Sequence, residues 1–78
     1  MTSTNTPTAE QITRHYSAAM DSVNLINDLM DLDSLDEEQV ATVDRNVSHL
    51  ELMVEKDYWT EENLQPFEEA IIRGKAVN

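Results

Sequence analysis

The chain has 78 residues, of which 16 are acidic and 5 are Lys or Arg, and its formal net charge at pH 7 is −11. Binding to DNA, RNA and anionic membranes depends on Lys and Arg contacts to phosphate, so this charge argues against all three as direct partners. There is no cysteine, which excludes disulfides and thiolate metal sites and fits a reducing compartment.

A chain of this length forms one domain and buries only about 60 to 65% of its unfolded surface. Small domains without disulfides or metals usually need a further chain to complete a stable core, so we expect a homo-oligomer that also binds a protein partner. The net charge is compatible with a basic partner and equally with a role in solubility alone. No apolar run approaches the roughly 18 residues needed to span a bilayer, and the N-terminal segment does not resemble a secretory signal. We therefore expect a cytoplasmic protein in which residues 1–7 are a disordered lead and residues 8–78 are a single helical domain.

The first predicted helix covers residues 9–31. Its apolar residues recur three and four positions apart, which is the spacing of one helix face. They are Ile12, Tyr16, Ala19, Val23, Ile26 and Met30. Thr8 followed by Gln11 matches a capping box, in which each side chain binds a free backbone amide at the start of a helix.

The second predicted helix covers residues 36–56 and shows the same spacing. Its apolar residues are Val40, Val43, Val47, Leu50 and Val54. Two capping boxes compete for its start, because Ser34 precedes Glu37 by three residues and Asp36 precedes Gln39 by three. We favour Asp36, since it also places Leu35 against Val40 as a hydrophobic staple.

The third predicted helix, residues 61–73, is shorter and carries Leu64, Phe67 and Ile71. Thr60 can cap it, with Trp59 and Leu64 as the staple. Trp59 is expected in the core, and Tyr58 either closes the hinge beside it or anchors a partner.

The end of the third helix carries two further signals. Gly74 follows Arg73, a pattern typical of a glycine that ends a helix. Glu69 lies four residues before Arg73, in the favourable order for an ion pair within the helix.

Together these segments predict an all-α fold: a long antiparallel helical hairpin with a shorter third helix, forming a three-helix bundle that can dimerise. The short connection near residue 33 forces the first two helices to be antiparallel, and the third helix is too short to cover the whole hairpin. Apolar side chains beside the main stripes are therefore expected to be exposed, which usually marks an interface. The predicted interface residues are Leu25, Leu29, Leu52, Met53 and Tyr58.

The stretch from Asp28 to Gln39 contains no Lys or Arg, and its six carboxylates fall within the eleven positions from Asp28 to Glu38. A calcium loop of the EF-hand type requires a central glycine, and none is present, so we expect no metal site. Asp36, Glu37 and Glu38 are explained by the helix dipole, which favours negative charge in a first turn.

Three of the carboxylates are not explained by the helix dipole. Asp28, Asp31 and Asp33 lie at the C-terminal end of the first helix, where the dipole disfavours them. They form a predicted acidic patch. The alternative functional hypothesis follows from it: an inhibitor that imitates phosphates and occupies the cationic site of a nucleic-acid-binding host protein.

The chain lacks the features of a catalytic site. Neither His15 nor His49 has a carboxylate one helical turn away to orient it as a base or metal ligand. There is no Gly-rich phosphate loop, nucleophile elbow or Cys nucleophile. We expect no enzymatic activity, no catalytic residue and no cofactor.

The segment "RNVSHLELMVEKDYWTEENLQPFEEAI", Arg45 to Ile71, resembles short all-α proteins of unknown function encoded by tailed bacteriophages and prophages. The shared pattern is a helix ending in Lys-Asp, an aromatic pair, and Thr-Glu-Glu opening a final helix. The resemblance implies a phage origin and the cytoplasm of a host cell. The sequence therefore predicts a non-enzymatic, acidic helical interaction module of the phage accessory or assembly type.

Overall fold

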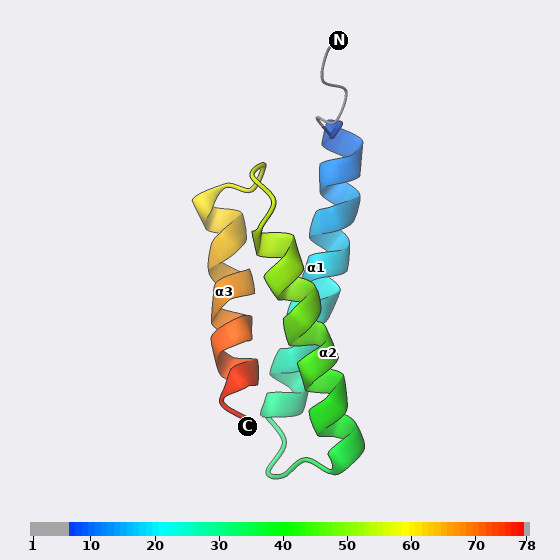
Figure 1. Cartoon of the computed structure of the whole chain (residues 1–78), viewed down its shortest axis with the longest axis vertical. Coiled ribbons are helices and arrows are strands. Elements are labelled where there is room, and N and C mark those ends of the chain that lie inside the picture. The colour runs from blue at the N-terminus through cyan, green and yellow to red at the C-terminus, as the bar shows by residue number, and fades with distance from the viewer. Residues whose placement is uncertain (1–6, 78) are drawn as a thin grey trace.

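The computed structural model describes residues 7–77, which form three α-helices and no strand. Figure 1 shows α1 (Ala9–Met30) and α2 (Glu37–Val54) as a hairpin with α3 (Glu61–Lys75) beside it, and all three pairs of helices are in contact. The predicted all-α fold is confirmed. Except for Pro7, the predicted disordered lead lies outside the described residues.

Each helix begins with a capping box. The sequence predicts the boxes of the first two helices, and for the third it predicts Thr60 as the cap without its partner Asn63. The Gln11 amide donates to Thr8 Oγ1 at 3.1 Å, and the Thr8 amide donates to Gln11 Oε1 at 2.9 Å. Thr60 caps α3 in the same way with Asn63. The free amides of both first turns are thereby paired within a few residues of sequence.

The choice between the two candidate caps of α2 is resolved by its first hydrogen bonds. The Gln39 amide donates to Asp36 Oδ1 at 2.8 Å, and the Asp36 amide donates to Gln39 Oε1 at 3.0 Å. Asp36 is therefore the cap, as favoured, and Ser34 remains in the connecting loop. Leu35 is half-buried and packs against the core.

The buried core runs along the inner faces of all three helices. It consists of Ala19, Val23, Ile26, Val43, Val47, Leu50, Met53, Trp59, Phe67 and Ala70. The Trp59 ring meets Phe67 edge-on with centroids 5.1 Å apart, and its Nε1 donates to the Met53 carbonyl at 2.7 Å. The predicted core role of Trp59 is confirmed, because both its ring and its single polar atom have partners inside the bundle.

Gly74 does not end α3, which is a correction to the prediction. The helix continues through Lys75, and Gly74 does not have a positive φ. It is buried where α3 crosses the hairpin, and a Cβ at this position would lie 2.3 Å from Val47 Cγ2 and 3.2 Å from Val43 Cγ1. Glycine is required here by the close approach of α3 to α2, and not by backbone conformation.

The predicted ion pair between Glu69 and Arg73 is also wrong. Arg73 instead reaches across to α1, where its guanidinium donates to Asn27 Oδ1 at 3.0 Å and pairs with the Asp31 carboxylate. Lys75 likewise pairs with Glu51 of α2 at 2.7 Å. The C-terminal end of α3 therefore uses its two cations to bind both helices of the hairpin.

Replacing Gly74 with Ala tests the close crossing. In an exposed helix this change stabilises by up to about 1 kcal/mol, but here we expect a loss of about 1–3 kcal/mol, because the new methyl group overlaps Val47. Denaturant unfolding followed by circular dichroism measures the change. The loss should shrink in a Val47→Ala background, which removes the overlapping atom, and a Gly74→Ala chain as stable as the original would contradict the packing.

Candidate functional site

A row of α1 and α2 side chains follows one side of the contact between these two helices, here called the α1–α2 seam. Ser22 of α1 meets α2 there, with Oγ 2.9 Å from Asn46 Oδ1 and 2.7 Å from His49 Nδ1. Residues three and four positions apart share one side of a helix, which extends the seam in both directions. Its members are His15, Ala18, Ser22, Leu25 and Leu29 of α1, and Thr42, Asn46, His49, Leu52 and Met53 of α2.

None of the ten seam residues is acidic, although 16 of the chain's 78 residues are. Exposed acids border the seam beside Leu25, because Asp21 lies four residues before it and Asp28 three residues after it. Two of its leucines are open to solvent, Leu25 with 40% and Leu52 with 63% of their surface exposed. The predicted interface residue Leu29 is half-buried, whereas Met53 is buried in the core and is not available to a partner in this structure. The seam is thus an uncharged surface with two exposed apolar side chains.

The polar contacts at the centre of the seam fix the position of one proton. Asn46 Nδ2 donates to the Thr42 carbonyl at 2.8 Å, so Asn46 Oδ1 can only accept the proton of Ser22. A hydroxyl has a single proton, and His49 Nδ1 must therefore carry its own proton and donate to Ser22 Oγ. This is the reverse of a nucleophile–base pair, in which the imidazole accepts the serine proton.

The fifth predicted interface residue, Tyr58, lies in the connection between α2 and α3 and is half-buried. Its hydroxyl is 2.6 Å from His15 Nδ1, and its ring centroid is 4.6 Å from that of Trp59. Burial, with a smaller contribution from the charge of Asp57, raises the pKa of the Tyr58 phenol. The hydroxyl is therefore neutral at physiological pH and ties α1 to the hinge.

The predicted acidic patch is not uniform. Asp31 pairs with Arg73, which accounts for a carboxylate that the helix dipole disfavours. Asp28 and Asp33 are exposed and make no ion pair with the described residues. Within residues 7–77, no group of three or more carboxylate or imidazole side chains is arranged to hold a metal ion.

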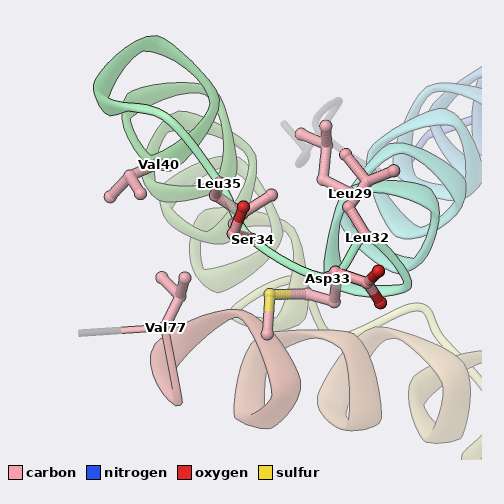
Figure 2. A pocket seen from close by; sticks show the side chains of 8 residues that line it. Leu29, Leu32, Asp33, Ser34, Leu35, Val40 and Val77 are labelled. Carbon is pink, nitrogen blue, oxygen red and sulfur yellow. The ribbon is translucent and has the colours of Figure 1, made fainter.

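A pocket of about 310 Å³ opens at the hairpin tip, and the sequence did not predict it. Figure 2 shows Val40 and Val77 on one side, Leu29 and Leu32 at the end of α1, and Asp33 and Ser34 in the loop between the helices. Met30 and Leu35 complete the lining. The sequence contained part of the information needed to predict this pocket. Leu32 does not belong to the apolar stripe of the first helix, and Leu35 was assigned only to the hydrophobic staple with Val40.

No family model matches the chain, and neither a curated protein nor a solved structure is similar to it. None of the helices described is long and apolar enough to cross a membrane.

The proton position at His49 can be measured directly. We expect a ¹H–¹⁵N correlation spectrum of the neutral imidazole to show the proton on Nδ1, although free histidine favours Nε2. Replacing Ser22 with Ala removes the acceptor and should shift the population towards Nε2. A wild-type ring protonated mainly on Nε2 would contradict the hydrogen-bond assignment and reopen Ser22 as a proton donor to His49.

Proposed function

We propose that this chain is a non-enzymatic interaction module that self-associates through the α1–α2 seam and binds a larger protein partner. The observation that carries the proposal is the uncharged seam with exposed Leu25 and Leu52 in a chain of net charge −11. Acidic surfaces of two copies repel each other, so copies can approach closely only where acids are few or face a cation, as Asp21 would face Arg45. Apolar side chains gathered at such a place are typical of an interface.

The charges beside the seam favour one arrangement of two copies. Asp21 precedes Ser22 and Arg45 precedes Asn46, and because Ser22 bonds Asn46, Asp21 and Arg45 lie at the same height along the hairpin. Both are exposed, and neither makes an ion pair with the described residues. A two-fold axis parallel to the helices would set Arg45 of each copy opposite Asp21 of the other, giving a self-complementary interface.

The larger partner is inferred from the resemblance of Arg45 to Ile71 to small phage-encoded helical proteins. That resemblance supports a phage accessory or assembly factor acting in the cytoplasm of a host cell. Such a factor uses apolar contacts, so its partner binding should tolerate added salt.

Leu25→Asp tests the seam, with Ile72→Asp as the matched control. Ile72 is 71% exposed on α3, so its replacement adds the same charge away from the seam. We expect Leu25→Asp to raise the dimer dissociation constant at least about tenfold, and Ile72→Asp to leave it nearly unchanged. Light scattering at several concentrations measures both, and equal effects of the two variants would contradict the seam.

A charge exchange tests the arrangement of the copies. Arg45→Glu alone should weaken self-association because two carboxylates then face each other across the two-fold axis. Adding Asp21→Arg should restore it, since the pair is re-formed with its charges exchanged. If the double variant does not recover the dimer while circular dichroism shows intact helices, the proposed two-fold arrangement is contradicted. That result would not test whether the seam is the interface, which the Leu25→Asp variant tests.

The alternative function, a phosphate-mimicking inhibitor of a nucleic-acid-binding host protein, is favoured by the unpaired carboxylates of Asp28 and Asp33. On this hypothesis the wild-type chain displaces DNA from a nuclease or repressor at low salt, and potency falls steeply as salt rises. The Asp28→Asn/Asp33→Asn variant should lose potency. Glu55→Gln/Asp57→Asn removes the same charge at the opposite end of α2 as the control, and equal potency of the two double variants would exclude a role for the tip.

A further inference from the structure

We infer that the pocket at the hairpin tip receives one large apolar side chain from a basic segment of a partner protein. This inference rests on the proposed function in one respect, the existence of a protein partner, and it names the chemistry that the partner must present. The pocket shares Leu29 with the α1–α2 seam, and its other seven lining residues lie outside the seam.

The shape and lining of the pocket indicate that the partner must insert an apolar side chain. Six of its eight lining residues are aliphatic or Met, and they come from α1, the connecting loop, α2 and the segment after α3. A volume of about 310 Å³ is at the lower limit for small-molecule pockets, and it suits a single Leu, Met or Phe side chain. Such a buried anchor is the usual centre of a protein interface.

The charge around the pocket indicates that the partner segment must be basic. Asp33 is exposed and lines the pocket itself (Figure 2). Glu37 and Glu38 lie close by in the first turn of α2, a few residues before the lining residue Val40, and are also exposed. None of the three makes an ion pair with the described residues. Lys or Arg residues flanking the anchor would therefore meet carboxylates whose charge nothing in residues 7–77 neutralises.

The same charges disfavour a second copy of this chain as the occupant. A copy docking tip to tip would bring its own Asp33, Glu37 and Glu38 against those of the first, and like charges placed together suppress association. Charge complementarity thus selects a basic partner at the tip, whereas the uncharged seam is left for self-association.

The test titrates the full chain at low ionic strength with a capped pentapeptide that has Phe at its centre and two Lys on each side. Methyl NMR should show saturable shifts at Leu35, Val40 and Val77, which line the pocket and do not belong to the seam. A peptide with Ala in place of Phe should bind at least about tenfold more weakly, because the apolar burial is lost. Asp33→Asn should weaken binding about two- to fivefold, and Asp57→Asn, at the opposite end of α2, should not.

Three results would overturn the inference. The Phe and Ala peptides could bind equally, which would mean that charge alone attracts them; the pocket methyl groups could fail to shift; or they could shift with protein concentration without peptide, which would make a second copy the occupant. Repeating the titration with the Leu25→Asp variant separates the two proposals. Retained binding supports the pocket independently of self-association, and lost binding in a folded variant contradicts a separate site.

Discussion

The close crossing at Gly74 is the contact on which the rest of the arrangement depends. Since no side chain stands between α3 and the hairpin at this point, the end of α3 approaches Val43 and Val47 of α2 and Ile26 of α1. That approach brings Arg73 within reach of Asn27 and Lys75 within reach of Glu51.

Local features of the fold were predictable from sequence, and tertiary ones were not. The capping boxes at Thr8, Asp36 and Thr60 depend on residues three positions apart, so the sequence contains all the information that places the helix starts. Gly74 was misinterpreted because a glycine near a helix end has two uses, termination and close packing, and only the position of Val47 distinguishes them. Arg73 was assigned to Glu69 because a helix pattern shows neighbours in sequence but not the acid that another helix supplies.

In the candidate sites, too, local features were predictable from the sequence and tertiary contacts were not. Periodicity placed Leu25, Leu29 and Leu52 beside the core stripes, where the structure has them, but it did not show that Met53 is buried beneath the seam. Ser22 bonds Asn46 and His49, which lie more than twenty positions away in the sequence. No sequence motif around any of the three residues indicates these contacts. The tip pocket could not be predicted from the sequence, because Val77 lines it together with Leu29 and Met30 of α1, which are far from it in the chain.

The distribution of charge gives the molecule two surfaces of different character. The seam carries polar groups paired inside the hairpin and two exposed leucines, with Asp21 and Arg45 beside it, which suits contact with an identical chain. The tip combines an apolar pocket with unpaired carboxylates, which suits a basic partner. A small domain that gains stability from its own copy on one surface keeps the other free for a different protein.

Sedimentation equilibrium of the unaltered chain at physiological ionic strength tests the central claim most directly, because it needs no variant and no partner. Self-association through the seam predicts a weight-average mass that rises reversibly with concentration from the 8.9 kDa of a single chain towards twice that value. A mass that stays at 8.9 kDa up to millimolar concentration would contradict self-association through the seam.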